Sequence, residues 1–272
     1  MFRFPEDPSQ AWCGSCYEKN PQCLFCNKPT SAEVLLQLDA NNVSCKECRT
    51  TAVQGLQEYE ELIDVIHPQV EQILGRTFKR IPVRLVTPSE MNVLMSTLQG
   101  SMPDPNIPEK SPANAGKGGS FLDPIEPQAT KRVGQFAHGL GLFIQRGNTR
   151  EIVLLNNLPA DMAWETISHE LTHAWQNEHY PGNMDFYLVE GFAQVIARKI
   201  CMRNYRSTRL NSIAEREDSY GHAYRVVHLL ETEQGLPGIL KALEERKLPP
   251  EFRTNSSQPY KEKDFVGTIT IN

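Results

Sequence analysis

Six of the seven cysteines in this chain lie within its first 48 residues, and all six belong to C-x-x-C pairs. The pairs Cys23-x-x-Cys26 and Cys45-x-x-Cys48 are 18 residues apart, which is typical of a four-thiolate zinc site bound from two tight turns. A disulfide or a redox centre is the competing interpretation. In the reducing compartment that we expect, paired cysteines more often hold a metal. Residues 1–50 are therefore predicted to form a zinc-finger module.

The first pair, Cys13 and Cys16, lacks two of the four ligands of a tetrahedral site, because no histidine occurs before His67. Three interpretations of these thiols are open. They are the trailing half of a finger whose first half is missing, they share or exchange a metal with the neighbouring pairs, or they are plain thiols. The seventh cysteine, Cys201, lies in an apolar helical run. We expect it to be a small buried hydrophobic residue.

Composition is that of an ordinary globular protein, with 272 residues, 39% hydrophobic and 22% charged. The net charge of −5 and a finger with four Lys or Arg against six Asp or Glu make nucleic acid a poor candidate partner. Met1–Gln10 has neither the basic start nor the apolar run of a secretion signal, and no stretch reaches the roughly 18 apolar residues of a membrane span. We expect a cytoplasmic protein without a membrane partner.

From Thr51 onward the hydrophobic pattern changes, and residues 51–272 are predicted to form a second, α+β domain that is mostly helical with a small mixed sheet. A long helix should end at about Leu74 before Gly75 and be kinked or split at Pro68. Further helices are expected over Glu90–Leu98, 161–178, 188–204, 212–232 and 237–246, and strands over Ile81–Val86, Gln135–Gln145, Glu151–Leu155 and Phe265–Ile271. Gly100–Ser120, rich in Pro, Gly, Asn and Ser, is expected to be a mobile loop.

The segment His169-Glu170-Leu-Thr-His173 lies inside the predicted helix 161–178. Residues four apart share a helix face, so both imidazoles can bind one zinc ion while Glu170 reaches a metal-bound water. A catalytic zinc takes three protein ligands, and we expect Glu190 to be the third, because Gly191 after it allows the backbone to approach the metal closely. The rival third ligands are His179, Asp185 and Glu178.

This set of residues predicts hydrolysis of peptide bonds, with a protein or peptide as the substrate. Zinc would polarise the scissile carbonyl, and Glu170 would take a proton from the water and pass it to the leaving amine. We expect the substrate to lie along a sheet edge formed by Phe136–Phe143. Tyr220 and His228 are candidate donors to the oxyanion, with interior packing as the alternative. Gln194 either hydrogen-bonds a metal ligand or is a surface polar residue.

Two stretches of the second domain, Ile167–Trp175 and Leu188–Val195, follow two cysteine stretches, Pro21–Cys26 and Val43–Cys48. Together they resemble the plant LIM-domain, ubiquitin-activated metallopeptidases that regulate organ size. The likeness runs from about Trp12 to Leu243 and includes Tyr220-Gly221, His228 and a closing helix near Gly238–Leu243. Its most specific part is the pair H-E-x-x-H-A-W and E-G-x-x-Q-V.

The resemblance implies a zincin-like (gluzincin) metallopeptidase domain preceded by a LIM-like zinc finger docked on it. In that family pattern His169, His173 and Glu190 bind the catalytic zinc, and Glu170 is the general base. Cys13 and Cys16 would be the last ligand pair of a preceding finger, of which the chain keeps only the end. Ubiquitin is a partner that the family suggests, but the chain has no ubiquitin-interacting helices and no complete tandem LIM region.

Two other classes of protein are alternatives to a zinc-dependent endopeptidase. A catalytically silent, zinc-stabilised adaptor, which the resemblance would make ubiquitin-related, needs the metal ligands but not the base, so the presence of Glu170 favours the enzyme. A nucleic-acid-binding zinc ribbon would require a basic finger.

Overall fold

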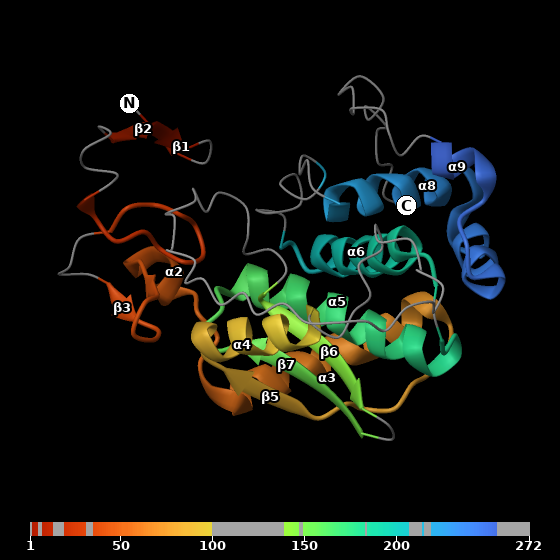
Figure 1. The fold of residues 1–272 in the computed structure, drawn as a ribbon, viewed down its shortest axis with the longest axis horizontal. Helices are drawn as coiled ribbons and strands as arrows, with labels where there is room; N and C mark the ends of the chain where they lie inside the picture. Colours follow the sequence, from red (N-terminus) through yellow and green to blue (C-terminus); the bar gives the residue numbers. More distant parts are fainter. Residues whose placement is uncertain are drawn as a thin grey trace, which may run out of the picture.

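The computed structural model describes residues 2–4, 7–12, 19–30, 35–99, 139–146, 149–182, 184–206, 214 and 219–254. Several predictions concern residues outside these ranges, namely Cys13, Cys16, the Gly100–Ser120 loop, residues 135–138, residues 212–213 and 215–218, and the strand Phe265–Ile271. Within the described residues the fold is α+β with a small mixed sheet, as predicted (Figure 1).

Two short antiparallel hairpins and one short helix make up the described part of residues 1–50. The elements are β1 (Phe2–Phe4) paired with β2 (Asp7–Trp12), β3 (Leu36–Gln37) paired with β4 (Val43–Ser44), and α2 (Lys46–Thr50). A tight turn follows Cys23, where the Asn27 N–H donates to the Cys23 carbonyl at 2.9 Å. Asn27 has a φ of 57°, which asparagine tolerates better than most residues. The first C-x-x-C pair of the metal site thus bends back on itself.

The second part of the chain contains a three-stranded sheet in the order β5-β7-β6. Its strands are β5 (Val83–Val86), β6 (Gly141–Arg146) and β7 (Thr149–Leu155). β5 is parallel to β7, whereas β6 is antiparallel to it, so the sheet is mixed. Ile152, Val153 and Leu154 of the central strand are fully buried. β6 lies at the edge of the sheet, and its Phe143 is opposite Ile152.

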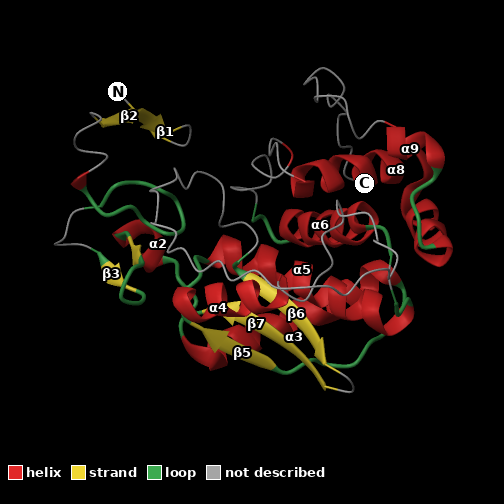
Figure 2. Cartoon of the chain, in the orientation of Figure 1, coloured by secondary structure: helices red, strands yellow, loops and turns green. Residues whose placement is uncertain are grey.

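Helices cover this sheet in successive layers (Figure 2). They are α3 (Gly55–Leu74), α4 (Pro88–Gln99), α5 (Ala160–His179), α6 (Phe186–Arg203), α8 (Ser219–Glu245) and α9 (Pro250–Thr254). α5 contacts the sheet, α3 and α6, and α8 packs on α6 (Figure 1). Helix α5 therefore lies in the middle of the stack, with Ile167, Leu171 and Trp175 fully buried.

Three predicted helix ends or breaks have different outcomes. Gly75 caps α3 with a φ of 69°, as predicted. Of the kink or split predicted at Pro68, the split is wrong, because α3 runs without interruption from Gly55 to Leu74, and the kink stays a prediction. The buried residues Ile66 and Val70 flank the proline, and their packing holds the helix together despite the lost hydrogen bond. The break expected between 232 and 237 lies at Gly235, whose φ of 67° and ψ of −174° kink α8.

Three contacts connect the start of α5 to the earlier chain. The Ala160 N–H donates to the Thr51 carbonyl at 2.8 Å, and the Val53 N–H donates to the Leu158 carbonyl at 2.9 Å. The buried Tyr59 hydroxyl accepts from the Leu158 N–H at 3.0 Å. The helix that carries the histidines thus begins at a point fixed by hydrogen bonds across about one hundred residues.

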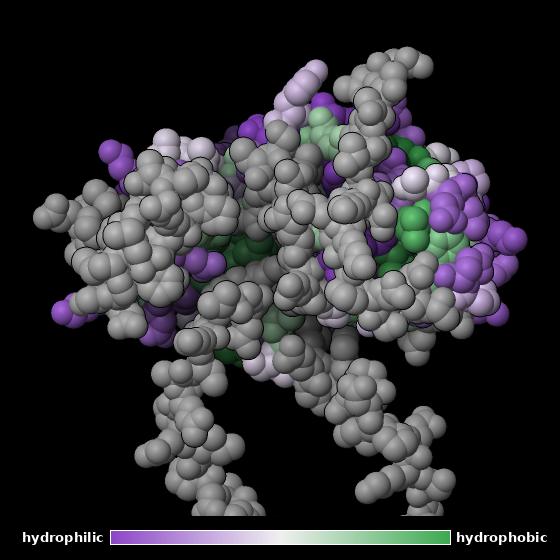
Figure 3. Space-filling view, turned by 90° about the horizontal axis from the view of Figure 1, so that it is seen from above, coloured by the Kyte–Doolittle hydropathy of each residue, from purple (hydrophilic) through white to green (hydrophobic). Residues whose placement is uncertain are grey.

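The described surface is mixed in polarity. In the space-filling view, hydrophilic side chains appear at both ends and along the top of the visible face, and hydrophobic ones lie among them in the middle and on the right (Figure 3). Among the described helices, none combines the length and the apolar character that crossing a membrane requires.

Candidate metal centre

His169, His173 and Glu190 come together where α5 and α6 pack against each other. The two histidines lie one turn apart on α5, and Glu190 lies in the first turns of α6. The Asp185 side chain caps α6 by accepting from the backbone N–H groups of Tyr187 and Leu188 at 2.9 and 3.3 Å. This cap sets the start of α6, so that Glu190 points at the histidines.

The three ligand atoms face one another at distances that suit a tetrahedral metal. His169 Nε2 lies 2.9 Å from His173 Nε2 and 3.2 Å from Glu190 Oε2, and His173 Nε2 lies 3.4 Å from the same oxygen. Bonds of about 2.0–2.1 Å in a zinc tetrahedron place neighbouring ligand atoms about 3.3 Å apart. The side chains are 14–17% exposed, so the group is sheltered but reachable. These residues fit a metal ion, and their donor set is compatible with zinc.

The rival third ligands are occupied elsewhere. Asp185 is the cap of α6, and His179 Nε2 bonds the Thr77 carbonyl at 2.9 Å. Glu178 accepts from Arg150 at 2.8 Å. Among the described residues, the metal-competent group near α5 contains Glu190 and none of these three.

Glu170, the residue after His169 on α5, contacts the edge strand β6. Its Oε2 accepts a 2.7 Å hydrogen bond from the Phe143 N–H. Burial raises the pKa of this carboxyl above its usual value, and the neighbouring His169 and His173 only partly offset the effect. A raised pKa suits a group that must accept a proton and later release it.

The charges of the group depend on one another. Burial disfavours the charged form of His173, but the adjacent Glu190 outweighs it and raises the pKa of the imidazole to about 9. Burial also acts to raise the pKa of Glu190, yet the two histidines bring it below the usual carboxyl range. The site thus favours a carboxylate facing positive charge, which is the electrostatic environment that a bound cation also supplies.

The structure corrects one sequence expectation about α6 and removes one of two alternatives for another residue. Gly191 does not serve an approach to the metal; a Cβ atom there would lie 2.2 Å from the Ala223 carbonyl oxygen, so this glycine lets α6 and α8 pack closely. Gln194 does not bond a metal ligand in the structure, since its Nε2 donates to Glu165 Oε1 at 3.2 Å.

Sequence reasoning missed one polar residue of the site, Gln176. Its Oε1 lies 2.8 Å from His173 Nδ1, and its Nε2 donates to the Val189 carbonyl at 3.0 Å. The side chain is 2% exposed. The signal in the sequence is the spacing of three residues from His173, which places both side chains on one face of α5.

The four cysteines of the two complete pairs form a second metal-competent group. The Sγ atoms of Cys23, Cys26, Cys45 and Cys48 lie within 4.8 Å of one another, and all four are free thiols. Cys45 caps α2, where its Sγ accepts from the Cys48 N–H at 3.5 Å. Cys23 acts to raise the pKa of Cys45, but hydrogen bonds from Cys26 and Cys48 prevail and lower it to about 7. This geometry favours a metal site over a disulfide.

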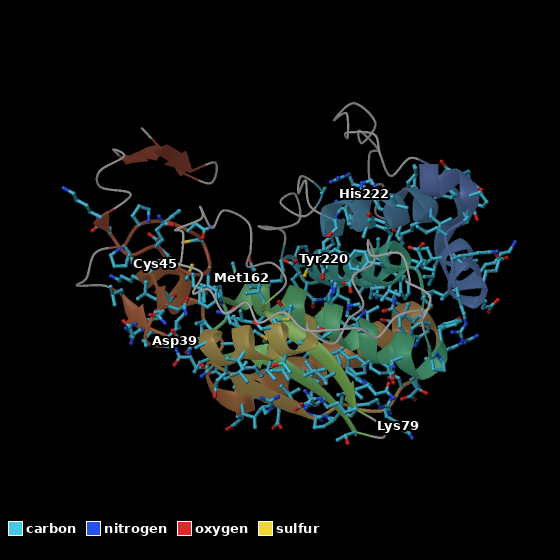
Figure 4. All side chains as sticks on the ribbon, in the orientation of Figure 1. Asp39, Cys45, Lys79, Met162, Tyr220 and His222 are labelled. Atoms are coloured by element: carbon cyan, nitrogen blue, oxygen red, sulfur yellow. The ribbon has the colours of Figure 1, made fainter. Side chains whose placement is uncertain are left out.

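Asp39, in the predicted finger module, bonds the second part of the chain. Its Oδ2 accepts from the Ser89 N–H and hydroxyl at 2.8 and 2.9 Å, in the first turn of α4. Figure 4 shows Asp39 and Cys45 together on the finger side of the molecule.

Both candidate oxyanion donors lie on α8, and Figure 4 labels Tyr220. Tyr220 meets the ring of Phe186 edge-on at 5.3 Å. His228 stacks on Tyr224 at 5.3 Å, and its Nδ1 lies 3.3 Å from Glu231 Oε2. Both residues are half-buried and make ring contacts, and donation to an oxyanion stays a prediction for both.

Comparisons of the chain with protein-family models, with curated proteins and with solved structures return no match. The functional argument therefore depends on the geometry of the two metal-competent groups.

Proposed function

We propose that the chain is a zinc-dependent endopeptidase of the gluzincin type. The observation that carries the proposal is the convergence of His169 Nε2, His173 Nε2 and Glu190 Oε2 beside a buried glutamate that is hydrogen-bonded to an edge strand. Three ligands from the protein leave a fourth position of a tetrahedral zinc for water, as catalytic sites require. The resemblance to LIM-domain metallopeptidases agrees with this arrangement.

Each residue has a defined role in the proposed reaction. Zinc, when bound, supplies Lewis-acid polarisation of the scissile carbonyl and a water of lowered pKa. Glu170 takes a proton from the attacking water and transfers it to the leaving amine. The Phe143 N–H holds Oε2 of Glu170 and so orients the base.

The position of β6 at the edge of the sheet supports the proposal that the substrate is a peptide. One side of β6 pairs with β7, and the N–H of its Phe143 donates to Glu170. An extended peptide that added to this edge would run past the base, and backbone hydrogen bonds would hold it whatever its side chains. Gly139–Phe143 is the described part of the predicted substrate edge.

The four cysteines are proposed to hold a structural zinc in a LIM-like finger. A structural site of this kind is closed by four protein ligands and contributes to folding rather than to chemistry. Its contact with α4 through Asp39 supports a docked finger.

Glu170→Gln tests the function, with Glu165→Gln as the matched control. Both changes replace a carboxylate by an amide on α5, but Glu165 bonds Gln194 and not the edge strand. We expect Glu170→Gln to keep its zinc, measured by elemental analysis, and to lose cleavage of a casein-like substrate by at least about 100-fold. His173→Ala should lose one zinc equivalent and the activity. Undiminished cleavage by zinc-loaded Glu170→Gln would refute Glu170 as the general base, and a zinc-loaded wild type that cleaves nothing would leave the adaptor.

A further inference from the structure

The amide of Gln176 bridges the two helices that carry the metal ligands. It bonds His173 on its own helix and the carbonyl of Val189, the residue before Glu190, on α6. The side chain is almost completely buried, so water does not compete strongly for either hydrogen bond. The proposed chemistry does not use this residue directly.

The two hydrogen bonds together define which imidazole nitrogen carries the proton. A carbonyl oxygen only accepts, so the group facing Val189 must be the amide NH₂ of Gln176. Its Oε1 is therefore the atom facing His173 Nδ1, and because an amide oxygen only accepts, Nδ1 must be the N–H. In the neutral imidazole this leaves the lone pair on Nε2, which points at His169 and Glu190.

The other histidine has no equivalent bond in the described part of the chain. His169 Nδ1 is buried and lacks a hydrogen-bond partner there. The two imidazoles therefore differ in the contacts that hold their Nδ1 atoms. One is oriented by a buried amide, and the other is held by packing and by the ligand group itself.

We propose that Gln176 is a positioning residue that fixes His173 in the tautomer able to bind zinc and ties Glu190 to it across the α5–α6 interface. This inference rests on the proposed zinc site. Partners of this kind orient a metal ligand, and their loss typically weakens metal binding about 10- to 100-fold.

The test compares Gln176→Met, Gln176→Glu and the control Gln194→Met in the full chain. Methionine keeps the approximate volume and removes both hydrogen bonds. Glutamate keeps an acceptor for His173 Nδ1 but loses the donor to Val189. Gln194 is the same residue type on the facing helix, and its bond goes to Glu165.

Zinc affinity is the first readout, measured by competition with a chelator. We expect Gln176→Met to weaken one of the two zinc equivalents about 10- to 100-fold and to leave the cysteine-bound equivalent unchanged. Gln176→Glu should recover most of the affinity, and Gln194→Met should match the wild type. Equal affinities in the wild type and a folded Gln176→Met protein would overturn the proposal.

The second readout is the Nδ1–H proton of His173 in ¹⁵N-labelled, zinc-loaded protein, which a purely structural role would not affect. We expect a slowly exchanging signal in the wild type and in Gln176→Glu, and its loss in Gln176→Met. If Gln176→Met does not fold, Gln176→Glu decides, because loss of both the signal and the affinity in that folded variant contradicts the tautomer argument. A wild-type protein that binds zinc with this signal but cleaves no peptide would refute the peptidase and leave the role of Gln176 intact.

Discussion

The backbone N–H of Phe143 donates a 2.7 Å hydrogen bond to Oε2 of Glu170 and joins edge strand β6 to the middle of α5. The two residues are 27 positions apart in the chain. This bond brings the proposed general base to the strand along which a peptide would lie. Its geometry depends on how closely β6 approaches α5, and that distance is set by a glycine.

Gly141→Ala should disturb this approach. A Cβ atom at Gly141 would lie 2.4 Å from Thr166 Cγ2 and 3.0 Å from Glu170 Cγ, so β6 and α5 must separate. We expect the free energy of unfolding to fall by about 1–3 kcal/mol and kcat/KM to fall by about 100-fold. Gly139→Ala is the control, because its nearest atom would be Met91 Cγ at 3.8 Å. Chemical denaturation and peptidase assays measure both effects, and a Gly141→Ala protein with wild-type values contradicts the prediction.

Tyr59→Phe should destabilise the start of α5. The buried hydroxyl donates to the Leu155 carbonyl at 2.7 Å and accepts from the Leu158 N–H at 3.0 Å. Its removal leaves two buried backbone groups without their partner, which costs about 1–3 kcal/mol of the free energy of unfolding. Tyr205→Phe is the matched control, since Tyr205 is 94% exposed and should change stability by less than about 0.5 kcal/mol. Equal unfolding midpoints of the two variants would disprove the role of Tyr59.

Asp39→Ala should loosen the finger from α4. The variant loses both hydrogen bonds to Ser89, and we expect about 0.5–2 kcal/mol less stability, as for other residues that cap a helix N-terminus. Asn41→Ala is the control, because only the backbone N–H of Asn41 bonds Asp39. Hydrogen exchange in α4 should rise in Asp39→Ala alone. Unchanged exchange would show that this contact does not hold the finger.

The effect of Asp39 should also depend on pH. Burial acts to raise the pKa of this carboxyl, but hydrogen bonds from Asn41, Asn42 and Ser89 outweigh it and hold the pKa below the model-peptide value. A lowered folded-state pKa stabilises the protein above the unfolded-state value of about 3.9, and this contribution disappears as pH falls through the folded-state pKa. The stability difference between wild type and Asp39→Ala is therefore expected to be constant near neutral pH and to shrink below about pH 4. A difference that grows in acid contradicts this sign.

Cys201 should resist alkylation. It is 2% exposed, and burial, with smaller effects of Glu165 and Asp161, raises the pKa of its thiol to about 12. At pH 8 almost no thiolate is present, and the thiolate is the reactive form. Peptide mapping after iodoacetamide treatment should show Cys201 unmodified in the native protein and modified after denaturation. Rapid labelling of the native thiol would place it in a different environment.

The same experiment reports on the finger. With zinc bound, the four clustered cysteines should be protected, and a chelator should expose them to alkylation. Protection that persists after removal of all metal would favour the disulfide interpretation.

Helix and strand types in the described residues could largely be predicted, because apolar residues recur with the period of each element. Pro68 shows the limit of that reasoning. Its local cost is real, but the helix continues because Ile66 and Val70 on either side are buried against the rest of the molecule. The sequence shows the destabilising effect of a proline inside a helix, but it does not show the packing that offsets this effect.

In the candidate site too, some features can be predicted from the sequence and others cannot. The spacing of His169 and His173 within one helix requires that they share a face, and Glu190 is recognisable from the sequence because it lies near the start of the next predicted helix. Gly191 was assigned to the wrong neighbour, since the carbonyl of Ala223 that it approaches lies 32 positions further along the chain. Gln176 was missed because its second partner, Val189, belongs to another helix.

By itself, the sequence determined the two C-x-x-C pairs, the histidine pair and the helix that carries the proposed glutamate base, because these follow from spacing within single turns and helices. Only the tertiary structure decided that Glu190 meets the histidines, that Phe143 holds Glu170 and that Gln176 orients His173. Each of these contacts joins atoms whose distance depends on how α5 packs against β6 and α6 or on the exact orientation of a buried side chain. Such distances arise from the whole core and are not encoded in any local pattern.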